Sequence, residues 1–454
     1  MDVTKDLEVM LGDPKKAIKS MMVPLIVSYL VVQLNIFADM SWCSGLGSNA
    51  SSAVSSIFPI YWIISGFGIG IGVGASTSIA RYLGKDDKAS ANSVATQTMV
   101  LAILFGVVVT PILLLAMDPM ITWMGIGDIR KECADYIIPM VWSSVILIVN
   151  GAIAGVVRAE GAAKKSMVIL LSAAILNIIL DPIFIFLLGM GVKGAAAATV
   201  ISQGCSALWV LLFLIRGEEI KLRRLRVVPS LLSKILKLGV SGFCFKVTNS
   251  LTQGIANMTL RAYGGASGAL YIGAMSIINS MREVVALPIS AISSSSQPVM
   301  GYNYGAKLNK RVVKTIRSLV VMCITYGMAA WAMVMVLPHV FISIFTPDEN
   351  LIGLTVPLMR IYFSCFFCMS FQNSGQNTFV ALNCPRRAVF FSLFRKVVLV
   401  VPLTLLFPLF LGVEGVFYAE AFSQAVGGTL CCLTMLMTVY RKVRNTPDGV
   451  RAEI

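Results

Sequence analysis

Two pairs of an asparagine and an aspartate lie within long apolar stretches of the sequence. Asn35 precedes Asp39 by four residues, and Asn177 precedes Asp181 by the same spacing. Residues i and i+4 share one face of a helix, so each pair would present its polar groups together. Ionisable residues inside a membrane span are costly and are functional candidates by default. The amide and carboxylate oxygens could hold a proton or a hydrated Na⁺. The alternatives are an interhelical hydrogen bond or, for Asp39 near its helix end, a carboxylate at the water interface.

Other charged side chains are scarce in these apolar stretches. Of the 22 acidic residues, four lie inside or at the edges of the predicted spans: Asp39, Asp181, Glu283 and Glu420. Arg282 directly precedes Glu283 and can neutralise it, whereas the sequence names no partner for Glu420. We expect Lys246 and Arg395 to extend along the apolar surface toward the cytoplasmic face. The ten cysteines lack metal-ligand spacing, and a single histidine cannot form a His-based metal site, so no cofactor is expected beyond a coupling ion, H⁺ or Na⁺.

The elements that must position these residues are membrane helices. The chain is 57% hydrophobic and only 13% charged, whereas a soluble protein carries about 25% charged residues. The apolar runs are continuous and about 20 to 25 residues long, which suits helices rather than alternating barrel strands. We predict an all-α protein with twelve spans: 18–42, 53–80, 92–117, 135–157, 166–190, 194–215, 238–260, 268–298, 313–338, 354–380, 388–411 and 414–440.

The net charge of +15 follows this topology. Most Lys and Arg residues fall in the two tails and in the loops on one side, and only Arg130, Lys131, Lys193 and Arg261 fall on the other. This bias predicts that both termini are cytoplasmic. The expected partners of the basic loops are therefore anionic lipid headgroups rather than nucleic acid.

The two halves of the chain repeat each other at one constant offset. Gly191-Val-Lys-Gly194 matches Gly412-Val-Glu-Gly415, and Ser202-Gln203 matches Ser423-Gln424. The offset covers six spans, an even number, so the halves insert in the same orientation as parallel repeats, an arrangement used by some secondary transporters. We therefore predict an N-terminal six-helix bundle over 1–215, a basic linker over 216–237 and a C-terminal six-helix bundle over 238–454. The counterparts of Asp39 and Asp181 are Leu260 and Pro402, so only the first half carries this carboxylate pair.

Several segments together resemble the multidrug and toxic compound extrusion (MATE) family over nearly the whole chain. They are GVGASTSIAR at 72–81 with LG at 83–84, RAEG at 158–161, LNIILDPIF at 176–184, GVKGAA at 191–196 and QPVMGYNYGA at 297–306. The resemblance implies a V-shaped pair of six-helix bundles that exports drugs against an inward flow of H⁺ or Na⁺.

Within the family the chain looks like the DinF-type branch. That branch has a first-bundle cation site, matched here by Asp39, Asn177, Asp181 and Thr199, and a proline at which the first helix is thought to bend, matched by Pro24. The branch with acidic residues in the seventh and tenth helices is not matched. Asn249 and Gln372 or Gln376 are the polar residues there. The remaining candidates for the substrate cavity or for gating are Pro24, Asn35, Gln203, Arg282, Glu283, Gln372 and Gln376.

We therefore expect a monomeric efflux antiporter in the bacterial inner membrane that exports lipophilic, cationic drugs or toxins. The alternative within transport is a flippase for lipids or lipid-linked saccharides. Such a cavity is often lined with cations that hold phosphates, and Arg282, Lys246 and Arg360 are the ones available. An intramembrane prenyltransferase would need an aspartate-rich Mg²⁺ motif, which the sequence lacks, so no enzyme is expected. A channel, which would not concentrate its substrate by ion exchange, is the remaining alternative.

Overall fold

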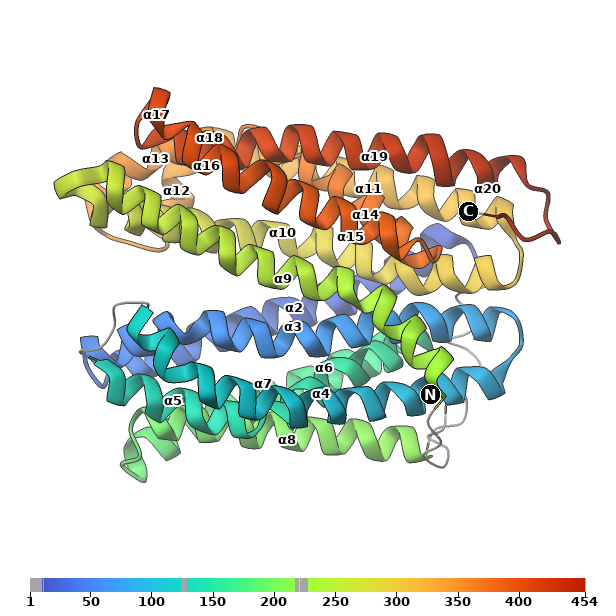
Figure 1. The fold of residues 1–454 in the computed structure, drawn as a ribbon, viewed down its shortest axis with the longest axis horizontal. Helices are drawn as coiled ribbons and strands as arrows, with labels where there is room; N and C mark the ends of the chain where they lie inside the picture. Colours follow the sequence, from blue (N-terminus) through green and yellow to red (C-terminus); the bar gives the residue numbers. More distant parts are fainter. Residues whose placement is uncertain (1–9, 11, 124–128, 217–219, 221–227, 454) are drawn as a thin grey trace. The chain divides into compact units, whose positions relative to one another are not determined.

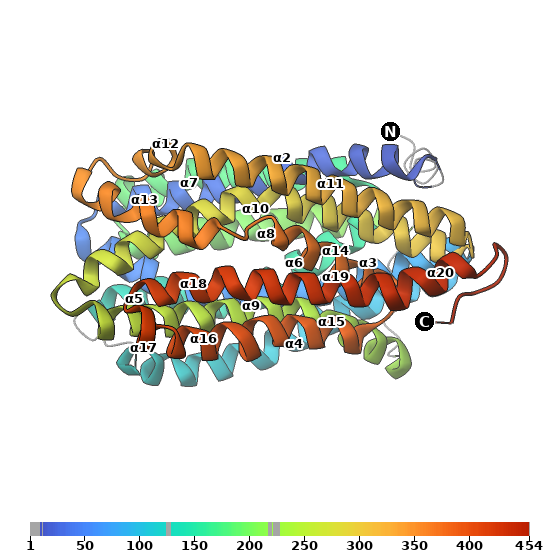
Figure 2. The ribbon, with the colours of Figure 1, turned by 90° about the horizontal axis from the view of Figure 1, so that it is seen from above.

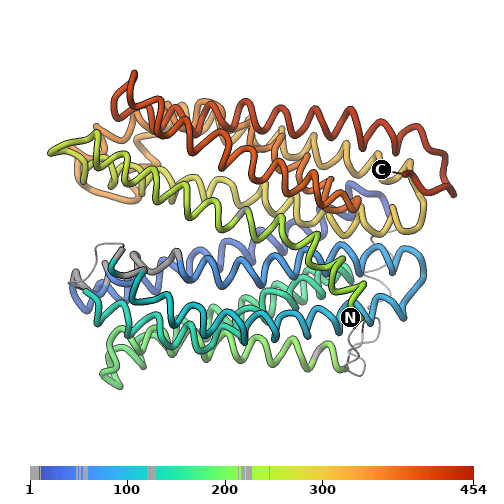
Figure 3. The backbone as a smooth tube through the Cα atoms, viewed as in Figure 1, coloured from blue at the N-terminus to red at the C-terminus, as the bar shows by residue number. Residues whose placement is uncertain are grey.

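The structure is a computed structural model of the 454-residue chain. It describes residue 10 and residues 12–123, 129–216, 220 and 228–453. Throughout these residues the regular structure is helical, with α, 3₁₀ and π turns and no strand. The first nine residues and, within the predicted linker 216–237, residues 217–219 and 221–227 lie outside the described part of the chain. The described residues pack as two compact units. Within each unit the helices lie side by side as a bundle (Figure 3).

Unit 1 comprises Val23–Lys246 together with the described part of Met1–Gly12. Its helices are labelled in Figure 1. In chain order they are α2 (Pro14–Ser44, from Val23 onward), α3 (Ser48–Gly84), α4 (Lys88–Trp123), α5 (Arg130–Trp142), α6 (Ser144–Ala159), α7 (Ala163–Pro182), the π turn η2 (Ile183–Leu187), α8 (Val192–Arg216) and the first part of α9 (Pro229–Gly264). Helix α3 packs against α4, α5 and α6, and α8 packs against α5, α6 and α7.

Unit 2 comprises Asp13–Met22 and Val247–Ile454. It contains the second part of α9, the 3₁₀ turn η3 (Gly265–Ser267), α10 (Gly268–Gly305), α11 (Asn309–Val336), α12 (Pro338–Ser343), α13 (Glu349–Phe363) and α14 (Cys368–Ala381). There follow α15 (Pro385–Leu393), π helix η4 (Phe394–Val400), α16 (Val401–Leu406) and α17 (Pro408–Leu411). The last helical segment is continuous from Glu414 to Asn445 (Figure 2). In chain order it consists of α18 (Glu414–Ser423), η5 (Gln424–Gly428), α19 (Thr429–Met435), η6 (Leu436–Tyr440) and α20 (Arg441–Asn445).

The helices confirm the predicted membrane fold. Nine helical segments of the described chain are long and apolar enough to cross a bilayer, and the total reaches eleven if each of two bent helix pairs forms one span. Those pairs are α5 with α6, bent by 56°, and α13 with α14, bent by 48°. One of the nine segments, 229–305, contains two helices, α9 and α10, that η3 joins in an antiparallel hairpin (Figure 1). Counting these two helices separately gives the twelve predicted spans.

The backbone repeats at the same offset as the sequence. Gly191 and Gly412 have φ angles of +59° and +60°, and Asp86 and Lys307 have φ angles of +58° and +57°. A residue other than glycine rarely adopts a positive φ angle. The presence of such an angle at two equivalent turns, one in each half, therefore indicates a duplicated fold. The break between α5 and α6 at Ser143 also recurs at the equivalent position of the second half, Ser364, between α13 and α14. The predicted parallel repeat is therefore visible in the conformation of each unit.

The glycines of α3 allow close helix packing and do not unwind the helix. Helix α3 is continuous from Ser48 to Gly84. A Cβ built on Gly155 of α6 would lie 2.2 Å from the carbonyl oxygen of Gly72, and a Cβ on Gly74 would lie 2.2 Å from that of Ile235. In a membrane, where helix association depends on close van der Waals packing, small residues are favoured at such contacts.

We expect the Gly155→Ala substitution to destabilise the protein by about 3 kcal/mol, the upper range for inserting a methyl group into a filled site. The clashing atom belongs to the Gly72 backbone and cannot rotate away. Gly204→Ala on α8 is a matched control, since a Cβ there meets nothing within 4 Å. It should stabilise the helix by up to about 1 kcal/mol through propensity alone. Thermal unfolding in detergent measures both, and equal midpoints for the two variants would show that the α3–α6 contact is not tight.

Candidate functional site

The predicted first-half site is brought together in unit 1. Asp39 on α2 and Asp181 on α7 have exposed fractions of 5% and 0%, and their carboxyl groups lie within hydrogen-bonding reach of each other. Asn177 donates its Nδ2–H to Asp181 Oδ1 at 3.1 Å and to Thr199 Oγ1 on α8 at 3.4 Å. Thr199 in turn donates to the backbone oxygen of Ala195 at 3.1 Å. The four residues named for a cation site from the family resemblance therefore form one buried cluster.

Several oxygen atoms of this cluster have no hydrogen-bond partner. They are Asp39 Oδ1, Asp181 Oδ2, Asn177 Oδ1 and, one turn before Asp39 on α2, Asn35 Oδ1. A buried acceptor without a donor is unfavourable. Two ionised carboxylates repel each other, and neither can donate a hydrogen bond to the other. A proton or a small cation between them would weaken the repulsion and give the acceptor oxygens a partner. Oxygen atoms are also the ligands that a hard cation such as Na⁺ prefers, so the residues present suit either ion. A group of three or more His, Cys, Asp or Glu residues that could hold a metal ion is absent from the described residues.

The structure adds neighbours that the sequence did not single out. Tyr136 of α5 is 4% exposed and lies close enough to interact electrostatically with both carboxyl groups. Asn150 of α6 donates its Nδ2–H to the Oε1 atom of Gln203, and Ser206 donates to Asn150 Oδ1 at 3.3 Å. The single asparagine in the apolar run of 144–157 was the available signal for Asn150. Gln203 therefore belongs to a polar contact between α6 and α8 in unit 1.

Pro24 lies inside α2, which is assigned as one uninterrupted helix. Its carbonyl oxygen accepts a hydrogen bond from Ser28 Oγ at 2.8 Å. Proline cannot donate a backbone hydrogen bond, so the helix is weakened at this point even where it stays continuous. The predicted bend near Pro24 remains a proposal.

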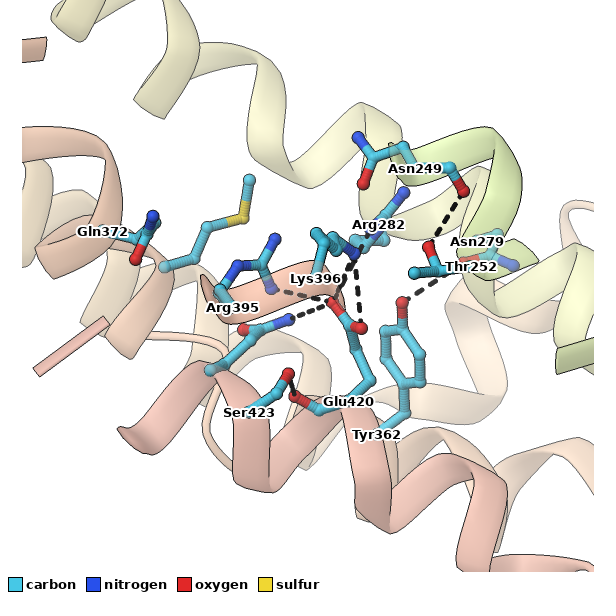
Figure 4. A network of polar contacts seen from close by, with 12 residues as sticks. Asn249, Thr252, Asn279, Arg282, Tyr362, Gln372, Arg395, Lys396, Glu420 and Ser423 are labelled. Carbon is cyan, nitrogen blue, oxygen red and sulfur yellow. Dashed lines mark hydrogen bonds and ion pairs between the residues drawn. The ribbon is translucent and has the colours of Figure 1, made fainter. Parts of the chain in front are cut away.

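A second buried polar cluster, not predicted as such, lies in unit 2 (Figure 4). The carboxylate of Glu420 on α18 accepts hydrogen bonds from Arg395 Nη1 at 3.0 Å and from Lys396 Nζ at 3.1 Å and 3.3 Å. Gln424 donates to the same carboxylate at 3.4 Å. On α10, the guanidinium of Arg282 lies 3.9 Å from Glu420 and 2.6 Å from the Glu283 carboxylate. We call Arg282, Glu283, Arg395, Lys396 and Glu420 the unit 2 charge cluster.

The expectation that Arg395 reaches the cytoplasmic face is wrong. Its exposed fraction is 5%, that of Lys396 is 2%, and both point at Glu420 (Figure 4). The two residues belong to the π helix η4. The wider π turn rotates less per residue than an α-helix, so neighbouring side chains can face one partner, and such turns often occur at functional sites.

The other second-half candidates divide between this cluster and its surroundings. Glu283 is neutralised by its neighbour Arg282, as expected from the sequence. Gln372 donates to Gln376 Oε1 at 3.2 Å and to the backbone oxygen of Phe391 at 3.4 Å, and it lies apart from the Glu420 carboxylate (Figure 4). The sequence therefore located Arg282 and Glu283 but not the group that assembles around Glu420.

Comparison with known proteins decides the family. A sequence model of the MatE family matches the chain twice, over residues 24–183 and 247–406. The chain belongs to the MatE family. The two matches lie one in each half, in agreement with the repeat, and the resemblance inferred from the sequence segments is confirmed. As a MatE protein the chain is a membrane transporter and not an enzyme.

Relatives with assigned names and solved structures agree with this membership. Multidrug export protein MepA of Staphylococcus saprophyticus is 25% identical over 445 residues, which cover 96% of each protein. MepA of Staphylococcus aureus is 25% identical over 398 residues, covering 87% of this chain and 86% of that protein. The structure of a MOP-superfamily transporter from Pyrococcus furiosus has a TM-score of 0.91 at 26% identity, covering 98% of this chain and 100% of that one. The structure of an outward-facing multidrug resistance MATE transporter of the MOP superfamily has a TM-score of 0.90, with the same identity and coverage.

In this MatE chain a small pocket opens beside the unit 2 charge cluster. Its volume is about 40 Å³. Arg282, Lys396 and Glu420 supply its charged lining, and its other lining residues are Asn249, Thr252, Gln253, Ala256, Met275, Asn279, Tyr362, Val400, Thr404 and Val416. Tyr362 donates its hydroxyl to Asn279 Oδ1 at 3.2 Å. Asn249, the polar residue of the seventh span, has a buried Oδ1 atom without a partner.

Proposed function

We propose that this MatE transporter is a multidrug efflux antiporter that exports lipophilic, cationic compounds in exchange for H⁺ or Na⁺. The observation that carries this proposal is the buried pair Asp39–Asp181, with acceptor oxygens that lack donors. The names of the MepA relatives support multidrug export. The resemblance of the sequence to the DinF-type branch, in which the first bundle carries the cation site, supports the choice of unit 1.

In the proposed cycle, Asp39, Asn177, Asp181 and Thr199 bind the coupling ion. Arrival of the ion removes one of the two negative charges of the carboxylate pair and supplies a partner for the orphan oxygens. This changes the packing of α2 against α7, and Pro24 is the point at which α2 yields. Release of the ion to the cytoplasm restores the charged pair for the next substrate. The protein would act as a monomer, with both termini in the cytoplasm of a bacterial inner membrane.

Efflux of a fluorescent cationic dye from proteoliposomes tests this function. The protein is reconstituted, and an inward pH gradient or an inward Na⁺ gradient is imposed separately. We expect one gradient to drive dye transport against its concentration and the other to leave it unchanged, which identifies the coupling ion. Protein-free liposomes with the same gradients are the control. A folded protein that moves dye equally with and without gradients would be a uniporter or channel, and antiport would be excluded.

A second candidate function is a flippase for lipids or lipid-linked saccharides. The specific observation in its favour is that Arg282, Arg395 and Lys396 converge in unit 2. Arg395 and Lys396 were not among the cations that the sequence offered for such a cavity. The same proteoliposomes decide between the two functions if they contain a fluorescent phospholipid. Bleaching of inner-leaflet label by membrane-impermeant dithionite would indicate a flippase, and we expect no bleaching beyond that of protein-free liposomes.

A further inference from the structure

The unit 2 charge cluster is not electrically balanced. It contains three cationic side chains, Arg282, Arg395 and Lys396, and two carboxylates, Glu283 and Glu420. Its net charge is therefore +1. Glu283 is the least buried of the five, with a side chain 47% exposed, whereas the other four are at most 14% exposed. An uncompensated cation inside a membrane bundle is costly, so a further anion would stabilise the group.

The pocket beside the cluster has unused hydrogen-bond donors. The Nε–H of Arg282 is buried and has no acceptor. The ammonium group of Lys396 has three N–H donors. Two of them bond to the Glu420 oxygens, with Nζ to Oε1 and Nζ to Oε2 distances of 3.1 Å and 3.3 Å. The side-chain amides of Asn249, Gln253 and Asn279 line the same pocket, and each can offer an N–H.

The volume of the pocket limits what can enter. About 40 Å³ accommodates roughly three water-sized groups, by the measure that one water needs about 10–15 Å³. A carboxylate has three heavy atoms and one negative charge, so it fits both the volume and the charge. The lining residues Met275, Val400 and Val416 provide an apolar wall on which the body of a larger molecule could rest.

We propose that this pocket is a subsite for the carboxylate of an amphipathic substrate, which Arg282 and Lys396 bind directly. The proposal deepens the efflux function and rests on it, because it adds zwitterionic compounds to the cationic ones. Arg395 is a positioning residue, since it binds Glu420 and does not line the pocket. The competing interpretation is a purely structural ion-pair network, with no affinity for any added anion.

The first test needs no drug and no gradient. The purified full-length protein is unfolded thermally at constant ionic strength with 100 mM acetate or 100 mM acetamide, which has the same shape but no charge. A ligand that binds only the folded state raises the unfolding temperature. We expect acetate to raise it by about 2 °C in the wild type and acetamide to leave it unchanged. Equal effects of the two compounds on the wild type would overturn the proposal, whatever any variant does.

Variants then locate the site. Arg282→Gln should abolish the acetate effect, and Arg282→Lys should keep part of it because the charge remains. Arg360→Gln is the matched control, because Arg360 is an exposed arginine of unit 2 outside the pocket, and it should behave as wild type. An acetate effect that survives Arg282→Gln, or that Arg360→Gln removes, would place the anion elsewhere and overturn the assignment.

A matched pair of dyes connects the site to substrates. Rhodamine 110 carries a carboxylic acid, and rhodamine 123 is its methyl ester. We expect the protein to bind the acid about tenfold more tightly than the ester, as one charge-assisted interaction provides, and Arg282→Gln should reduce this ratio to about one. Wild type without preference for the acid would overturn the substrate assignment. Gradient-driven export of the ester is measured separately. If the wild type fails to export the ester, the efflux function is refuted and the carboxylate subsite is not.

Discussion

Replacing Asp181 with asparagine should reduce gradient-driven dye export by about 100-fold, near the upper end of a coupling free energy of about 1–3 kcal/mol. Asp181 is fully buried and holds one of the orphan acceptor oxygens beside Asp39. Asparagine keeps the size of the side chain but can neither bind and release a proton nor carry the charge that attracts Na⁺. Asp39→Asn should give the same loss, because the two carboxyl groups interact directly.

The measurement is initial dye efflux in proteoliposomes under the driving gradient, together with dye binding to the purified variant. Binding should persist, which separates loss of coupling from loss of folding. Asp118→Asn is the control carboxylate of the same unit, since Asp118 is 57% exposed in an ion pair with Arg130. Surface ion pairs contribute little, so this variant should transport normally. Wild-type export by Asp181→Asn would refute the proposed coupling site.

Replacing Glu420 with glutamine should destabilise the protein by about 3–5 kcal/mol, the cost of removing one partner from a buried ion pair. Glu420 accepts hydrogen bonds from both Arg395 and Lys396, and its loss leaves three cations facing only the half-exposed Glu283. The unfolding midpoint in detergent is the measurement. The additional substitution Lys396→Met should recover part of the loss, because it removes a cation that has lost its partner.

Glu283→Gln provides the comparison for this prediction. Its carboxylate pairs with Arg282 from a side chain that is 47% exposed. Water compensates an exposed charge, so we expect a change of less than about 1 kcal/mol. Equal midpoints for Glu420→Gln and Glu283→Gln would show that the cluster does not depend on the buried position of Glu420.

The sequence by itself determined the membrane fold. Apolar runs of bilayer length define helices, because a backbone in hydrocarbon must satisfy its hydrogen bonds within each segment. The constant offset between matching segments defined the repeat, and equivalent turns such as Gly191 and Gly412 adopt the same backbone angles. The sequence also indicated the first-half site, since a carboxylate within an apolar run has few structural reasons to be there.

Only the tertiary structure decided which side chains surround Glu420. Arg395 and Lys396 follow a basic stretch at 386–387, and in the sequence they read as part of a cytoplasmic helix end. The π helix η4 turns both of them inward to Glu420, which lies 24 and 25 residues away along the chain. Helical periodicity describes the faces of one helix and not which faces of two helices meet, so this pairing had no sequence signal. Asp39 and Asp181 lie far apart along the chain, and their coming together depends on the packing of α2 and α7 in the same way.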